Sequence, residues 1–172
     1  MPANLEKIKL SIVVPVYSGA DYLESLAHQV DALRSRWIEH NAPIELAEAI
    51  FVDDAAIDNS LSVLNTLSAK YPWISVITLS RNFGQHPAIF AVFQAVRGQV
   101  IVTLDADLQN PPEEIPKLVA KIEAGYDTVG GWREIRHDSF FRRLPSAFIN
   151  WLMSKVTGVY LRDYGCMLRA YR

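Results

Sequence analysis

The feature that most constrains the fold is a regular alternation between short apolar runs and longer stretches with helical periodicity. Runs rich in Val and Ile predict strands, and apolar residues three or four apart predict helices. The predicted strands cover residues 10–17, 44–52, 74–79, 100–102, 128–132 and 165–171, and the predicted helices cover residues 21–40, 61–70, 88–96, 113–123 and 140–156. This alternation is typical of an α/β protein with a doubly wound, mainly parallel sheet and helices on both faces.

Size and composition limit the classes of protein further. A chain of 172 residues, half of them hydrophobic, is long enough for one domain with a well-buried core. No apolar run approaches the roughly 18 residues expected of a membrane span, and no secretory signal sequence is visible. The single cysteine, Cys166, excludes a disulfide within the chain and fits a reducing compartment. Neither G-x-G-x-x-G nor G-x-x-x-x-G-K occurs, which argues against dinucleotide oxidoreductases and P-loop proteins.

Charge is distributed unevenly along the chain, although the net charge is only −2. Residues 132–172 contain eight basic and three acidic side chains, whereas the rest of the chain contains nine basic and sixteen acidic ones. An acidic first part that could bind a metal ion is thus followed by a basic part that could bind anions. Ordinary surface charge would explain the same distribution.

The strongest candidate site is the stretch Thr103–Pro112, which follows a predicted strand. Asp105 and Asp107 stand where that strand ends, and ligands of open α/β sheets bind at the carboxyl ends of strands. In an extended backbone both carboxylates would project to the same side, where their repulsion favours a bound cation. Gln109 continues the spacing with a neutral oxygen. We predict that Asp105, Asp107 and Gln109 bind Mg²⁺ or Mn²⁺ together with a diphosphate; the alternative is a solvated acidic loop.

Other strand ends carry residues that suit a nucleotide. Pro15 and Tyr17 end the first predicted strand, where Tyr17 could pack on a base or cover the core. Asp53 and Asp54 end the second, where one of them could accept hydrogen bonds from a base or a sugar hydroxyl, or cap the turn. Arg81 lies in the loop after the third predicted strand, where it could bind a donor phosphate or have a packing role. Together these strand ends could hold a base, a ribose and a diphosphate.

Four motifs occur in the order found in family 2 glycosyltransferases with the GT-A fold. They are Val14–Tyr17, Val52–Asp54 with Asp58–Ser60, Arg81–His86, and Asp105–Glu114. The chain resembles the polyisoprenyl-phosphate branch of this family, which includes the dolichyl-phosphate mannose synthases. Within that branch, residues 163–172 are most similar to the undecaprenyl-phosphate 4-deoxy-4-formamido-L-arabinose transferases. The resemblance covers nearly the whole chain from Leu10.

The resemblance implies an inverting, metal-dependent transfer of a sugar from a nucleotide-sugar, expected to be a UDP-sugar, to a polyisoprenyl (undecaprenyl) phosphate. The reaction would serve cell-envelope glycan or lipid A modification. By motif, the nucleotide-sugar would be bound by Pro15, Tyr17, Asp53, Asp54, Arg81 and Asp105, the cation by Asp105, Asp107 and Gln109, and the acceptor phosphate by Arg133 with Arg142 or Arg143. Asp105, Asp107 and Arg133 would be the catalytic residues.

The chemistry of this reaction can be argued separately from the resemblance. A phosphate acceptor has a second pKa of about 6, so it is mostly ionised and nucleophilic near neutral pH. A strong general base is therefore not required, and the protein must instead bring two anions together. Arginine side chains bind phosphate bidentately, and the basic segment after Trp132 contains them.

The chain departs from the usual motifs at two places. Ser18-Gly19 replaces the more usual Asn-Glu after Tyr17, and the turn after the second predicted strand also differs. The family usually has Asp-Asp-Gly-Ser where this chain has Asp53-Asp54-Ala55-Ala56. Alanine at the third position is costly if the turn needs a positive φ, and Ala56 lacks a capping hydroxyl.

We expect residues 1–172 to be a single catalytic domain, truncated before C-terminal membrane-associated helices, because the chain stops inside a predicted strand. In the intact protein the site would face the cytoplasm at the inner membrane, with residues 140–155 nearest the bilayer. These 172 residues alone would be soluble. No nucleic-acid partner is expected, and the sequence leaves open whether the chain forms a homo-oligomer.

Three other functions are compatible with the sequence. A transferase of the same family that acts on a glycan or a protein would keep the metal site without needing the arginine cluster. A nucleotidyltransferase would normally show a glycine-rich basic loop after the first strand, which Tyr17–Ala20 is not. A non-catalytic nucleotide-sugar-binding module would fit Ala55 and Ala56.

Overall fold

The computed structural model describes residues 6–131, 155 and 166–172. The acceptor-site predictions at Arg133, Arg142 and Arg143, and the helix predicted at residues 140–156, lie outside this part of the chain. In the part that is described, no helix has the length and apolar character needed to cross a membrane.

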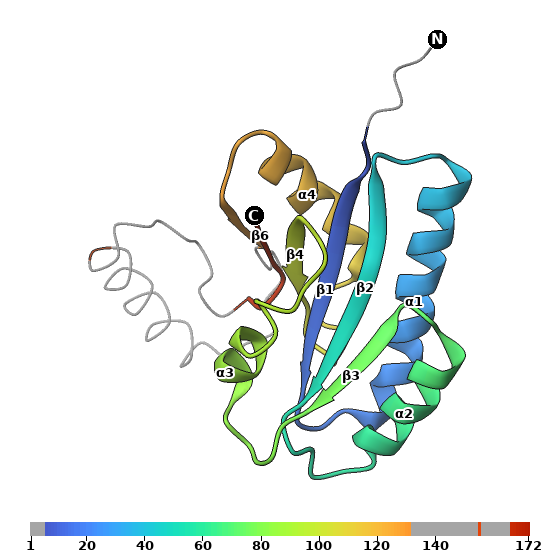
Figure 1. The fold of residues 1–172 in the computed structure, drawn as a ribbon, viewed down its shortest axis with the longest axis vertical. Helices are drawn as coiled ribbons and strands as arrows, with labels where there is room; N and C mark the ends of the chain where they lie inside the picture. The colour runs from blue at the N-terminus through green and yellow to red at the C-terminus, as the bar shows by residue number, and fades with distance from the viewer. Residues whose placement is uncertain (1–5, 132–154, 156–165) are drawn as a thin grey trace, which may run out of the picture.

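Strands and helices alternate along the chain. The strands are β1 (Ile8–Val16), β2 (Ile44–Asp53), β3 (Ile74–Thr78), β4 (Val100–Thr103), β5 (Thr128–Gly130) and β6 (Arg169–Tyr171), and the helices are α1 (Ala20–Glu39), α2 (Ser60–Lys70), α3 (Gln85–Phe90), the short 3₁₀ helix η1 (Pro112–Glu114) and α4 (Ile115–Glu123). Across the described residues the strands form one sheet in the order β3-β2-β1-β4-β6-β5 (Figure 1). Strands β1 to β4 pair in parallel, and β6 is antiparallel to both β4 and β5. The prediction of an α/β fold with a mainly parallel sheet is confirmed.

Helices cover both faces of the sheet, as predicted (Figure 1). Alternate residues of β1, such as Ile12 and Val14, pack with α1, α2 and α4 on one face. Val13 faces the other side and packs with Ala88 and Ile89 of α3. Because the central strands are buried on both faces, their sequences are continuous apolar runs rather than alternating ones.

The prediction for α3 was wrong in its bounds. The helix covers Gln85–Phe90 instead of 88–96, and the chain then continues through turns closed by hydrogen bonds such as Ala95 N to Val92 O. Val92 is still buried against the sheet, so the apolar spacing continues after the α-helical backbone has ended. The earlier start places Gln85 in the first turn of the helix.

The helix after the acidic motif was predicted more closely. Residues 112–114 form a 3₁₀ turn before α4 begins, instead of the first helical turn expected from Glu113. At the other end Gly125 has a φ of 102° and its N–H donates to Ile122 O, while Tyr126 N donates to Lys121 O. This is the left-handed C-cap expected of a glycine at that position.

Candidate functional site

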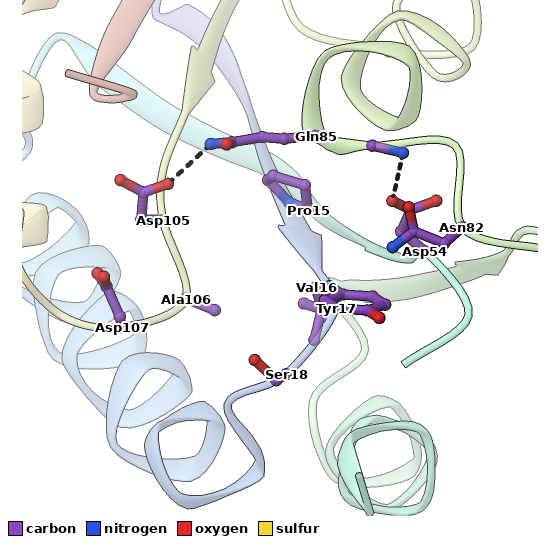
Figure 2. Close-up of a pocket in the computed structure, with 11 residues that line it drawn as sticks. Pro15, Val16, Tyr17, Ser18, Asp54, Asn82, Gln85, Asp105, Ala106 and Asp107 are labelled. Carbon is purple, nitrogen blue, oxygen red and sulfur yellow. Dashed lines mark hydrogen bonds between the residues drawn. The ribbon is translucent and has the colours of Figure 1, made fainter. Parts of the chain in front are cut away.

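The carboxyl ends of three neighbouring strands, β2, β1 and β4, meet at one edge of the sheet. A cleft of about 390 Å³ lies there, lined by Pro15, Val16, Tyr17, Ser18, Asp54, Asn82, Gly84, Gln85, Asp105, Ala106 and Asp107. Figure 2 shows Tyr17, Asp54 and Asn82 at one end of the cleft and Asp105 and Asp107 at the other. Of the eight predicted site residues in the described part of the chain, the cleft brings together Pro15, Tyr17, Asp54, Asp105 and Asp107, whereas Asp53, Arg81 and Gln109 are not among the lining residues.

Asp105 is held from two sides immediately after β4 ends at Thr103. Its Oδ1 accepts a hydrogen bond from Gln85 Nε2 at 3.1 Å, and its Oδ2 accepts one from Asn110 Nδ2 at 3.3 Å. Asn110 is only 4% exposed, and its Oδ1 lies 3.5 Å from the Cys166 Sγ. Two neutral amides are therefore among the groups that position this carboxylate, and neither adds a charge of its own.

Asp107 is exposed and lies in a turn. The chain turns at Ala106 and Asp107, so the prediction that extended backbone aligns the two carboxylates was wrong, although both line the same cleft. The Oδ1 of Asp107 accepts a hydrogen bond from the backbone N–H of Gln109 at 3.1 Å, and Leu108 between them has a φ of 60°. The turn leaves the Gln109 side chain exposed and outside the cleft lining.

The two aspartates at the end of β2 have different environments. Asp54 is 2% exposed and lines the cleft, and its two oxygens accept hydrogen bonds from the backbone N–H groups of Phe83 (2.7 Å) and Gly84 (2.8 Å). Asp53 instead caps the turn, with its Oδ1 accepting from Ala56 N at 2.9 Å. Asp54 therefore lines the cleft and Asp53 caps the turn, whereas the sequence left open which of the two had which role.

Aromatic and amide side chains line the Asp54 end of the cleft. Tyr17 is 45% exposed there, which suits packing against a flat ligand better than a role in the core. The Arg81 guanidinium lies over the Phe83 ring at 4.8 Å, so the packing alternative describes its observed contact. Asn82 and Gln85 were not predicted as site residues. Their position inside the motif Arg81–His86 was the available signal.

The N-terminus of α1 is already bound by a carboxylate of the protein. Asp58 Oδ2 accepts hydrogen bonds from the N–H groups of Gly19 (2.8 Å) and Ala20 (3.2 Å), and Oδ1 accepts from Ser60 N (3.0 Å). The hydrogen bond from the Ser60 side chain, followed by these backbone bonds, holds the pKa of the Asp58 carboxyl well below its usual range. Helix N-termini commonly bind phosphate groups, but the N–H groups that begin α1 are engaged by Asp58.

The cleft is acidic, and this decides which ligands it suits. The lining residues include the three carboxylates of Asp54, Asp105 and Asp107 and no Lys or Arg from the described part of the chain. No group of three or more His, Cys, Asp or Glu side chains gathers as a metal site within that part. Mg²⁺-type sites often use one or two carboxylates and complete the shell with substrate phosphates. Asp105 and Asp107 fit a divalent cation that binds together with a diphosphate.

Ala55 has a φ of 54°, so the turn after Asp54 does adopt the positive φ that is costly for alanine. Holding a non-glycine residue in the left-handed region costs roughly 1–2 kcal/mol. Glycine avoids this cost, but its unfolded chain has greater conformational freedom, which offsets part of the gain in stability. We expect Ala55→Gly to stabilise the fold by about 0.5–1 kcal/mol, which raises Tm by about 1–4 °C. Ala56→Gly, at a position without a positive φ, should lower Tm in the same thermal-unfolding experiment. A lower Tm for Ala55→Gly would contradict the argument.

The comparison with known families fits this geometry. The sequence pattern described as "Glycosyl transferase family 2" matches residues 11–169. The chain belongs to glycosyl transferase family 2. The predicted family is therefore confirmed, and the sheet described above is the frame of a family 2 domain.

Curated relatives extend the match to the predicted branch. This family 2 chain is 49% identical over 165 residues to the undecaprenyl-phosphate 4-deoxy-4-formamido-L-arabinose transferase of Pseudomonas fluorescens, covering 95% of this chain and 47% of the relative. It is 46% identical to the protein of the same name from Klebsiella pneumoniae, covering 95% of this chain and 49% of the relative. The chain thus spans about half the length of the curated relatives it matches.

Solved structures share the fold of this family 2 chain at low sequence identity. Mannosyl-3-phosphoglycerate synthase from Rubrobacter xylanophilus superposes with a TM-score of 0.71 at 16% identity, over 95% of this chain and 53% of that one. A mannosyltransferase from Pyrobaculum calidifontis, solved in complex with GDP-Man and Mn²⁺, gives 0.62 at 20% identity, over 96% and 44%. Glucosyl-3-phosphoglycerate synthase from Mycobacterium tuberculosis, in complex with Mn²⁺, UDP and glucosyl-3-phosphoglycerate, gives 0.67 at 16% identity, over 95% and 56%. These similarities confirm the predicted GT-A fold.

Proposed function

We propose that this chain is a single catalytic domain that transfers a sugar from a UDP-sugar to a polyisoprenyl phosphate with inversion at the anomeric carbon, using Mg²⁺ or Mn²⁺. The curated relatives are named as transferases that use undecaprenyl phosphate. Two of the structural neighbours are described in complex with Mn²⁺ and a nucleotide or nucleotide-sugar. The proposal applies these properties to the cleft at the ends of β1, β2 and β4.

The observation that carries the proposal is the charge of this cleft. A diphosphate that enters it meets three carboxylates and no cationic side chain among the described lining residues, and like charges held close together are strongly unfavourable. The N–H groups of Gly19 and Ala20 at the start of α1 already donate to Asp58. The proposed ligands of a cation are therefore Asp105 and Asp107, with Gln109 retained from the motif. When bound, a divalent cation would stabilise the negative charge that develops on the departing diphosphate.

The rest of the cleft would bind the nucleoside and hold the donor in place. Tyr17 would pack against the base, with Pro15 beside it on β1. Asp54 would accept a hydrogen bond from the base or ribose in addition to those from the backbone, since each carboxylate oxygen has two lone pairs. Asp53 and Arg81 would support this end of the cleft through the turn and the loop that they stabilise.

The acceptor would supply the nucleophile itself. An ionised phosphate oxygen attacks the anomeric carbon from the side opposite the leaving diphosphate, the new C–O bond forms as the old one breaks, and the configuration inverts. No proton has to be removed from such an acceptor near neutral pH, because its second pKa is about 6. Arg133, with Arg142 or Arg143, would hold the acceptor phosphate against the repulsion of the donor. The site would then work at the cytoplasmic surface of the inner membrane, where the lipid headgroup lies.

The acceptor part of the proposal is tested by removing two of these arginines. We expect the double change Arg133→Ala with Arg143→Ala to lower the rate of transfer to a short-chain polyisoprenyl phosphate by roughly 100-fold or more, because charge-assisted bonds contribute about 1.5–3 kcal/mol each. UDP affinity should stay unchanged. Product formation is measured by mass spectrometry of the lipid fraction, and UDP affinity by calorimetry.

A matched control is Arg34→Ala with Arg36→Ala, which removes two partly exposed positive charges from α1, away from the cleft lining. It should leave both quantities unchanged. If UDP affinity falls as much as transfer in the Arg133 and Arg143 variant, these arginines serve the donor or the fold. If the unaltered chain glycosylates a free glycan and not the lipid phosphate, the acceptor class is wrong.

A further inference from the structure

We infer that Gln85 is a positioning residue that, together with Asn110, fixes the orientation of the Asp105 carboxylate for a cation–diphosphate ligand. This rests on the proposed function, since it concerns the same cleft. The family motif drew attention to Asp105 and its neighbours in sequence, whereas Gln85 lies twenty residues earlier and reaches the site from α3.

The first observation is the pair of amides on one carboxylate. Gln85 donates to Oδ1 and Asn110 donates to Oδ2, and the two side chains come from different parts of the chain. Figure 2 shows the Gln85 side chain extending across the top of the cleft to Asp105. With a donor on each oxygen, the plane of the Asp105 carboxylate is set before any ligand arrives. Outer hydrogen-bond partners of this kind commonly orient carboxylates that bind metals.

The second observation is that the Asn110 amide and the backbone that leads into Gln85 are themselves held. The Oδ1 of Asn110 lies against the thiol of Cys166, and its side chain is buried, so the Nδ2 is directed at Asp105. Gln85 follows directly after Phe83 and Gly84, whose N–H groups are bound by Asp54. The backbone from which Gln85 reaches is therefore fixed by a carboxylate at the other end of the cleft.

Hydrogen bonds, joined by a short stretch of backbone, consequently connect the two ends of the cleft. The connection runs from Asp54 through the backbone at residues 83–84 to the Gln85 side chain and on to Asp105, as the two dashed lines in Figure 2 mark.

The Gln85 amide also has the right chemistry for this position. A lysine or arginine there would hold Asp105 equally well, but its positive charge would compete with the cation. A neutral amide orients the carboxylate and adds no positive charge of its own.

The test compares Gln85→Met with the unaltered chain. Methionine has nearly the same length and volume as glutamine but no amide, so it removes the hydrogen bond and keeps the packing. UDP affinity is measured by calorimetry in Mn²⁺ and again in EDTA, and Tm is recorded for each protein. We expect the gain in UDP affinity that Mn²⁺ provides to fall about tenfold, as for loss of an outer partner of a metal ligand. Affinity in EDTA and Tm should not change.

Two further variants sharpen the comparison. Gln85→Ala should show the same loss as Gln85→Met if the amide, and not the bulk of the side chain, is what matters. Gln94→Met, at an exposed glutamine that follows α3 and does not line the cleft, should behave as the unaltered chain.

The outcomes separate this inference from the proposed function. An unchanged Mn²⁺-dependent gain in Gln85→Met would overturn the inference alone. An equal loss in Mn²⁺ and in EDTA would also overturn it, because Gln85 would then contact the nucleotide or hold the loop. If the unaltered chain shows no Mn²⁺-dependent gain at all, the proposed cation site and the inference both fail.

Discussion

Asp107→Ala should remove nearly all of the Mn²⁺-dependent part of UDP binding while leaving the fold intact. Asp107 is exposed, and within the described part of the chain its carboxylate accepts one hydrogen bond, from the N–H of Gln109 inside the same turn. Its loss therefore costs little stability. Loss of an outer partner of a metal ligand costs about 10–100-fold in affinity, so we expect loss of a direct ligand to cost at least about 100-fold. Calorimetric titration of UDP in Mn²⁺, with Tm as the check on folding, measures both effects.

Asp127→Ala is a suitable control for this experiment. Asp127 is an exposed aspartate outside the cleft lining, so its removal changes the net charge equally without touching the site. It should bind UDP as the unaltered chain does. If Asp107→Ala retains full Mn²⁺-dependent UDP affinity, the assignment of the cation to this end of the cleft is wrong.

Asp54→Ala should weaken UDP binding in EDTA as well as in Mn²⁺, and should also destabilise the fold. Its carboxylate is buried and accepts backbone hydrogen bonds at 2.7 and 2.8 Å from the loop that carries Gln85. Hydrogen bonds to charged groups contribute about 1.5–3 kcal/mol each, and rearrangement of an edge loop recovers part of this. We expect a loss of about 3 kcal/mol of stability, a fall in Tm of about 6–12 °C, and a fall in UDP affinity of at least about tenfold.

The two neighbouring aspartates allow a conservative comparison. Asparagine keeps one acceptor oxygen, so Asp53→Asn can retain the hydrogen bond from Ala56 N, whereas Asp54→Asn must lose one of its two. We therefore expect a weakened affinity for UDP in Asp54→Asn and a nearly normal one in Asp53→Asn. Equal effects of the two would mean that the turn as a whole, and not Asp54, supports the cleft.

The strands and their neighbours were predictable because a strand that is buried on both faces contains successive apolar residues. The strands β1, β2 and β4 each contain a run of successive apolar residues, namely Ile12–Val14, Ala49–Val52 and Val100–Val102. Their shared edge followed from the α/β pattern. The end of α3 was not predictable in this way. Val92 continues the apolar spacing in a backbone of turns, and spacing alone does not distinguish the two.

Details of the site depended on contacts between distant residues. The spacing of Asp105, Asp107 and Gln109 suggested three aligned oxygens, but residues 106–107 form a turn instead of extended backbone, and the Gln109 side chain is exposed outside the cleft lining. The next residue, Asn110, is the one that bonds Asp105. The contact between Gln85 and Asp105 joins the first turn of α3 to the segment after β4, and the spacing within either segment does not indicate it.

The central claim is that the cleft between Tyr17 and Asp107 binds a nucleoside diphosphate through a divalent cation. The most direct measurement is the affinity of the unaltered chain for UDP and for uridine, each in Mn²⁺ and in EDTA. Uridine lacks the diphosphate, so the account predicts that Mn²⁺ strengthens UDP binding at least about 100-fold, by about 2.8 kcal/mol or more, and leaves uridine binding unchanged. Equal UDP affinity in Mn²⁺ and in EDTA would contradict the account.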